Sequence, residues 1–144
     1  MTTTISRRHL ILAAPVLMTG LGGCAATASS EGGQAALFQR ARAYWALIRA
    51  NDRVGAWAYE ELSKDPNATL EAYLKRGGIA FEAVEVRDVK SIEGERGLVS
   101  VWMRYSLPQL RVKRQEAIAE DEWRLINGVW HHVQRRSSLF ATPE

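Results

Sequence analysis

The chain has almost no cysteine, and this scarcity limits how the protein can be stabilised. Cys24 is the only cysteine among 144 residues, so neither an intramolecular disulfide nor a cysteine-rich metal site can form. The sequence also lacks a glycine-rich phosphate loop, a Ser-His-Asp order and a cluster of metal ligands. We therefore expect an apolar core to hold the domain together, and we predict no cofactor and no metal.

Long apolar runs are missing as well. The longest uncharged, mostly apolar stretch is Leu10 to Leu21, about a dozen residues, whereas a membrane-spanning helix needs ~20. Arg7-Arg8 precedes this stretch, and Gly20 and Gly22-Gly23 supply small residues at its end. A basic segment, a short apolar run and small residues are typical of an export signal.

Cys24 follows this segment directly, in Leu21-Gly22-Gly23-Cys24. The pattern resembles a bacterial lipoprotein signal, which implies that residues 1–23 are removed and that Cys24 is acylated, with palmitate among its lipids. Ser6-Arg7-Arg8-His9-Leu10-Ile11 also looks like a twin-arginine signal, although Leu10 stands where phenylalanine is usual, so twin-arginine and general secretory export both remain open. Ala25 is not the aspartate associated with inner-membrane retention, and the resemblance thus favours the outer membrane, with the domain facing the periplasm.

The charge balance gives little support for a polyanionic partner. The leader carries two of the 19 Lys and Arg residues and none of the 16 Asp and Glu residues, which leaves 17 against 16, a formal net charge of +1. Arg111, Lys113 and Arg114 form one basic group and Arg135-Arg136 another, but Glu116 and further acidic residues lie near the first. Nucleic-acid binding needs a continuous basic face, and we exclude it.

The mature chain has the length of a single domain. Residues 24–33 are small and polar and predict a flexible tether, residues 34–135 form the domain, and residues 136–144 lose periodicity and predict a disordered tail. Apolar residues recur at helical spacing near the start of the domain: Leu37, Phe38, Ala41, Tyr44, Trp45 and Ile48. Asp52 can cap a second helix that reaches Leu62. Thr69 or Asn67 can cap a third, which Gly77-Gly78 ends.

From Ile79 onward the pattern changes to that of strands. A first strand runs through Val84 and Val86 toward Ile92 with an irregularity, and Glu93–Gly97 forms a turn. The second strand alternates faces, with Val99, Val101, Met103 and Tyr105 on one side and Ser100, Trp102, Arg104 and Ser106 on the other. A third strand covers about residues 112–126, and Asn127-Gly128 predicts a two-residue turn. This turn pairs Trp123 with His132, Arg124 with His131, Leu125 with Trp130 and Ile126 with Val129.

Helices followed by an antiparallel meander predict an α+β domain. The segment Ala43-Tyr44-Trp45-Ala46-Leu47-Ile48 and the hairpin from Trp123 to His132 resemble the nuclear transport factor 2-like superfamily (SnoaL-like, cystatin-like cone) over residues 37–134. The resemblance implies N-terminal helices packed in the concave face of a bent four-stranded antiparallel sheet. It leaves function open, since members include isomerases, cyclases, dehydratases and proteins without activity.

Three functions therefore compete. In an isomerase, dehydratase or cyclase, His132 is the candidate base on the inner face, with Tyr44, Tyr59 or Tyr105 as partners; in the simpler interpretation it packs against Trp123 and its ring nitrogens reach water or backbone. In a binding protein, an apolar small ligand could occupy a pocket lined by Tyr44, Trp45, Trp57, Met103, Tyr105, Trp123 and Trp130. In the alternative, these side chains simply fill the core. A homodimer or a periplasmic protein partner could use an outer sheet face. We expect His131 to be solvated on that face. The face comprises Trp102, Arg104, Ile118, Arg124, Ile126, Val129 and His131. We predict a lipid-anchored periplasmic binding or assembly module with no assigned catalysis.

The lipoprotein interpretation predicts the outcome of Cys24→Ser. The variant should accumulate as an unlipidated precursor while its domain still folds, because the anchor contributes nothing to the apolar core. Mass spectrometry of the membrane fraction and circular dichroism test the two parts. Wild-type protein recovered in solution with an intact leader and a free thiol would contradict the prediction.

Overall fold

The structure, a computed structural model, describes residues 25–76 and 79–134. Cys24 with its leader, Gly77-Gly78 and the tail from residue 135 lie outside the described residues. The lipid anchor, the glycine stop of the third helix and the disordered tail therefore stay predictions.

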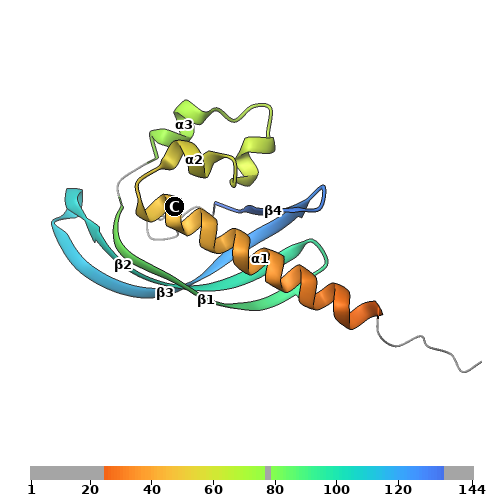
Figure 1. The fold of residues 1–144 in the computed structure, drawn as a ribbon. Helices are drawn as coiled ribbons and strands as arrows, with labels where there is room; N and C mark the ends of the chain where they lie inside the picture. Colours follow the sequence, from red (N-terminus) through yellow and green to blue (C-terminus); the bar gives the residue numbers. More distant parts are fainter. Residues whose placement is uncertain (1–24, 77–78, 135–144) are drawn as a thin grey trace, which may run out of the picture.

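The architecture is α+β, as predicted. A long helix, α1 (Ala25–Arg49), crosses one face of an open antiparallel sheet, and its strands follow the order β1-β2-β3-β4. Figure 1 shows the curved sheet on one side of α1 and the shorter helices beyond the C-terminal half of α1. The shorter elements are α2 (Arg53–Trp57), the 3-10 helix η1 (Glu61–Lys64) and α3 (Leu70–Leu74).

The helices differ from the predictions in two places. α1 begins at Ala25, so residues 25–33 are helical where we expected a flexible tether; the alanines in this stretch are strong helix formers and extend the helix that follows. Asp52 caps α2 as predicted, since its side chain accepts from the Gly55 amide, and the Thr69 side chain accepts from the Ala72 amide to cap α3. α2 ends at Trp57 and does not reach Leu62.

The early end of α2 has a cause in the sheet. Glu60 is extended (φ −74°, ψ 140°) and forms an isolated parallel bridge with His132. The Tyr59 carbonyl accepts from the His132 amide at 2.8 Å. The chain after α2 therefore lies against the sheet edge, and the Tyr59 carbonyl bonds to the strand and not to a further turn of helix.

The strands confirm the predicted register. They are β1 (Ala80–Glu93), β2 (Arg96–Leu107), β3 (Val112–Ile126) and β4 (Val129–His132), with a short 3-10 turn η2 (Pro108–Leu110) between β2 and β3. The four predicted pairs of the closing hairpin are all present. β1 has three register shifts against β2, which is the expected irregularity.

The core lies between α1 and the middle of the sheet. Leu37, Ala41, Val99, Val101 and Trp123 have no exposed surface. Gly97 permits this close packing, because a Cβ there would lie 2.5 Å from Cδ2 of Leu37. The aromatic side chains that face the helix are thus mostly used in filling the domain.

The closing turn gives a test of the fold. Asn127 and Gly128 have φ of 50° and 77°, so Gly128→Val forces a β-branched residue into a conformation it resists and should lower the free energy of unfolding by about 1 kcal/mol or more. Gly128→Asn is the matched control and should cost less, because asparagine adopts positive φ more readily. Chemical denaturation measures both, and an unchanged valine variant would contradict the turn.

Candidate functional site

His132, the candidate base, lies at the end of β4 between two carboxylates. Its Nδ1 is 2.9 Å from Oε2 of Glu60, and its Nε2 is 2.9 Å from Oδ1 of Asp121. Glu60 comes from the segment after α2 and is fully buried, while Asp121 lies on β3 and is 8% exposed. Three segments far apart in sequence therefore meet at one imidazole ring.

The remaining carboxylate oxygens also have donors. The Tyr44 hydroxyl donates to Oε1 of Glu60 at 2.8 Å. The indole N–H groups of Trp45 and Trp123 donate to Oδ2 of Asp121 at 2.9 and 2.8 Å. A buried carboxylate is costly unless such bonds compensate it, and here every oxygen is bonded. We call the group of Tyr44, Trp45, Glu60, Asp121, Trp123 and His132 the His132 network.

The charges in the His132 network favour a protonated histidine. Burial by itself lowers the pKa of His132, but the negative charges and hydrogen bonds of Asp121 and Glu60 outweigh it and raise the pKa to about 10. Burial, reinforced by Glu60, raises the pKa of Tyr44 well above its ordinary value and that of Tyr73 to about 12. A pKa raised in this way favours an imidazolium ring near neutral pH, with Tyr44 stacked on it at 4.4 Å.

This geometry bears on catalysis. An imidazolium donates from both nitrogens and has no lone pair with which to accept a proton, so protonation and the two bound carboxylates disfavour His132 as a general base near neutral pH. Of the expected tyrosine partners, only Tyr44 contacts the ring, stacking at 4.4 Å, while Tyr105 lies beside Phe81. The simpler interpretation is right about the contact with Trp123, at 5.6 Å, but wrong about the ring nitrogens, because they bind carboxylates.

His131 departs from its prediction. It is only 3% exposed, so it is not the solvated side chain that we expected on the outer face. The segment around residue 60 runs beside β4, and Lys64 and Arg40 lie near enough to lower the pKa of His131 further, after the larger effect of burial. The pairing of Glu60 with β4 explains the error, since no local pattern places that segment there.

Glu60 and Asp121 were missed in the sequence analysis. Asp121 had a signal, because it lies two residues from Trp123 and strand alternation places both side chains on the same face. Glu60 had none, because it lies within the segment that the helical pattern covered. Its role depends on a contact 72 residues away.

The predicted aromatic pocket does not form as one cavity. Tyr44, Trp45, Trp123 and Trp130 belong to the buried core, and Met103 packs against it. Trp57 lies instead against Tyr73, with ring centroids 5.2 Å apart. The structure thus uses most of these side chains to fill the domain and separates Trp57 from the others.

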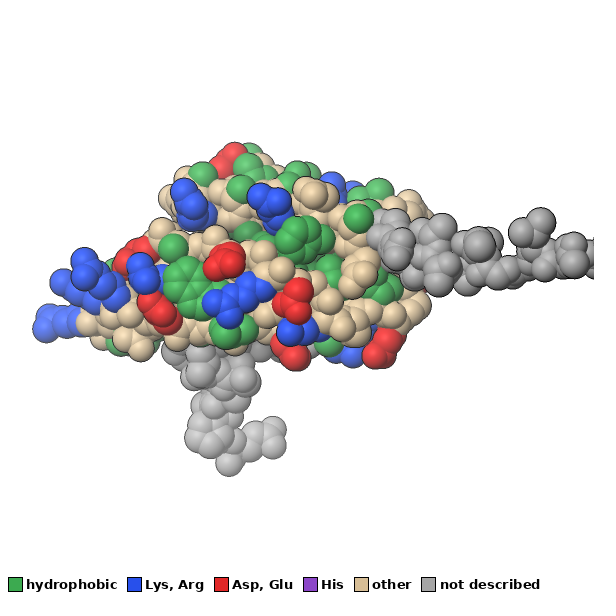
Figure 2. All heavy atoms as spheres, turned by 60° about the horizontal axis from the view of Figure 1, so that its bottom comes forward, with side chains coloured by type: hydrophobic (Ala, Val, Ile, Leu, Met, Phe, Trp, Pro, Cys, Tyr) green, Lys and Arg blue, Asp and Glu red, His purple; other side chains and the backbone are tan. Residues whose placement is uncertain are grey.

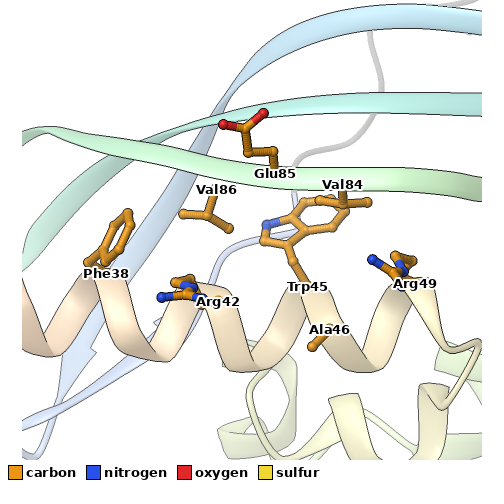
Figure 3. Close-up of a pocket in the computed structure, with 8 residues that line it drawn as sticks. All are labelled: Phe38, Arg42, Trp45, Ala46, Arg49, Val84, Glu85 and Val86. Atoms are coloured by element: carbon orange, nitrogen blue, oxygen red, sulfur yellow. The ribbon is translucent and has the colours of Figure 1, made fainter.

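An open groove of about 410 Å³ lies between α1 and β1 (Figure 3). We call it the α1–β1 groove. In Figure 3, Val84 and Val86 point toward the helix, Phe38 and Trp45 extend from the helix toward the strand, and Arg42 and Arg49 lie on the helix beside them. The groove is lined by Phe38, Arg42, Trp45, Ala46, Arg49, Val84, Glu85 and Val86. Trp45 is the one predicted pocket residue that lines it.

The outer face of the sheet carries most of the predicted interaction residues. Trp102 pairs with Ile118, which is 62% exposed, and Arg104 lies 5.5 Å over the Trp102 ring while pairing with Glu116 at 2.7 Å. Arg124 forms an ion pair with Glu61. Figure 2 shows acidic and basic side chains interspersed with apolar ones over this face, so its apolar surface is divided.

Among residues 25–76 and 79–134, no group of three or more His, Cys, Asp and Glu side chains is placed to hold a metal ion. None of the helices described is both long and apolar enough to span a membrane.

The raised pKa predicts how stability depends on pH. A histidine whose pKa rises from 6.5 to about 10 on folding stabilises fully below pH 6.5, and this stabilisation is lost as the pH rises toward 10, by about 1.4 kcal/mol per pH unit. Urea unfolding of the wild type should show this slope, and His132→Gln should reduce it by about that amount. Equal slopes in the two proteins would show that His132 is not charged in the folded state.

Comparisons with known proteins add no relative. No family model, curated protein or solved structure matches this chain. The resemblance to the nuclear transport factor 2-like superfamily therefore rests on the quoted sequence segments, beside an α+β arrangement with N-terminal helices on a four-stranded sheet.

Proposed function

We propose that the protein is a lipid-anchored periplasmic binding or assembly module of the nuclear transport factor 2-like type, attached to the outer membrane through Cys24. The leader that ends at Cys24 supports the anchor. A long helix laid across a bent antiparallel sheet is compatible with the cone of that superfamily. Neither feature assigns a reaction.

One observation carries the proposal of a non-catalytic domain: both ring nitrogens of His132 are bound to buried carboxylates. A catalytic base needs a free lone pair within reach of its substrate. The α1–β1 groove and three other grooves open on the described surface, and none of these four is lined by Glu60, Asp121 or His132. The His132 network thus has the features of a structural link, which disfavours the alternative of an isomerase, dehydratase or cyclase.

Binding and assembly use different surfaces. The α1–β1 groove offers a concave apolar floor beside cationic side chains, which suits a bound partner or ligand. The outer sheet face offers Trp102 and Ile118 among ion pairs, which suits a modest contact between copies. We favour binding in the groove because it is concave.

A turnover assay tests the non-catalytic assignment. Wild-type protein and His132→Gln are incubated with ketosteroid-like and small hydroxy-carbonyl substrates, and neither should exceed the background rate. Turnover by the wild type that falls by ~10²–10⁴-fold in His132→Gln would overturn the proposal, because that is the contribution expected of a general base.

Sedimentation separates assembly from binding. If copies associate through the outer face, Trp102→Ala should convert oligomers to monomers, while Val54→Ala, at an exposed apolar residue of α2, should not. We expect no dependence on Trp102 if the groove is the working surface. Oligomers that dissociate only in Trp102→Ala would assign the domain to assembly.

A further inference from the structure

We propose that the α1–β1 groove binds an extended acidic peptide segment of a partner protein, which pairs with the free edge of β1 as an additional strand. This inference rests on the proposed binding function and names the class of its partner. Its evidence comes from three independent features of the groove: the backbone of β1, the apolar floor and the charge of the rim.

The backbone of β1 offers an unpaired edge at the groove. β1 is the first strand of the sheet, and no other described segment pairs with its outer side. Its pairing with β2 is uninterrupted from Ala83 to Val86, and register shifts lie on either side of this stretch. Unpaired N–H and C=O groups on a regular strand are a template for a further strand. The groove residues Val84, Glu85 and Val86 all lie within this stretch.

The floor of the groove is apolar and rigid. Val84 and Val86 point toward α1, where Phe38 and Trp45 meet them (Figure 3). The Trp45 indole cannot rotate freely, because its N–H donates to Asp121 in the His132 network. A peptide strand directs alternate side chains to one face, so an apolar residue of the bound segment would contact a preformed surface, which lowers the entropic cost of binding.

The rim of the groove is positively charged. Arg42 and Arg49 are exposed and seven residues apart on α1, so they lie about 10.5 Å apart along the helix, a span of about three residues of extended chain. Neither guanidinium forms an ion pair with another described residue; Arg42 contacts only the Phe38 ring, at 5.9 Å. Glu85 points away from the helix. Acidic side chains on the bound segment would complement the two arginines.

Other occupants fit less well. An anionic amphiphile could satisfy the floor and the arginines but would leave the edge of β1 unpaired. A second copy of the chain could pair through the same edge, and the two copies would then be related by a two-fold axis with their α1–β1 grooves side by side. That arrangement would bring the arginines of both copies together, which is unfavourable.

The test uses the full chain carrying Cys24→Ser and a synthetic, end-blocked peptide of about seven residues. Its second and sixth residues are glutamate, its fourth is valine and the others are threonine, so that the valine and both glutamates lie on the face directed toward α1. Nuclear magnetic resonance should show saturable shifts of the amides from Ala83 to Val86. Arg42→Glu and Arg49→Glu should each weaken binding about tenfold or more, because each replaces an attractive charge with a repulsive one. Arg111→Glu is the matched control, because Arg111 is an exposed arginine in the turn between β2 and β3, and it should bind like the wild type.

Two altered probes make the proposal falsifiable. A peptide N-methylated on alternate residues should lose binding, because it cannot pair with β1; equal binding would rule out strand addition. A peptide with lysine in place of glutamate should also fail to bind. Shifts produced by dodecanoate or anionic vesicles but not by the acidic peptide would assign the groove to an amphiphile and overturn the proposal.

The failure of this inference can be told apart from failure of the proposed function. An acidic peptide that causes no shift at millimolar concentration, with a domain that remains inactive in the turnover assay, overturns only the assignment of the groove. Turnover that depends on His132 overturns the proposed function itself. Unchanged melting temperatures of the arginine variants would show that their effects come from the groove and not from unfolding.

Discussion

The contact of His132 with both Glu60 and Asp121 is the interaction on which the rest of the domain depends. Its partners tie the segment after α2, the middle of the sheet and α1 to a single ring. If only the packing of the helices acted on it, the segment after α2 could remain helical and extend α2. The ion pairs fix it against β4, where Glu60 forms its bridge. Such a group is stable only when all of its partners are present, because removing one partner from a buried ion pair commonly costs about 3–5 kcal/mol.

The same completeness supports the proposal that His132 is a structural residue. Catalytic sites keep one nitrogen of the ring free or bound to a group that moves during the reaction. His132 has fixed carboxylates on both sides and an aromatic ring stacked on it. Strongly perturbed pKa values mark candidate sites in general, but here the perturbation arises from a closed cluster in the core.

The sequence predicted what depends on local chemistry. Asn127-Gly128 determined the register of the closing hairpin, Asp52 and Thr69 the starts of two helices, and alternation the faces of β2. It did not predict what depends on distant contacts. Glu60 lies within the segment that the helical pattern covered, and only its bridge to β4 reveals its place; His131 was expected to be solvated because that bridge was not foreseen. The alanine-rich start of α1 was misjudged because its small polar residues resemble a linker as much as a helix.

The register shifts of β1 have a consequence for solubility. They interrupt the regular edge at Phe81/Ala83, Val86/Asp88 and Val89/Ser91, and each bulge twists the strand away from a flat template. Only a short stretch of backbone therefore remains open, too short to nucleate the stacking of long strands into fibrils. An edge divided in this way prevents chance encounters between copies of the chain from growing into aggregates.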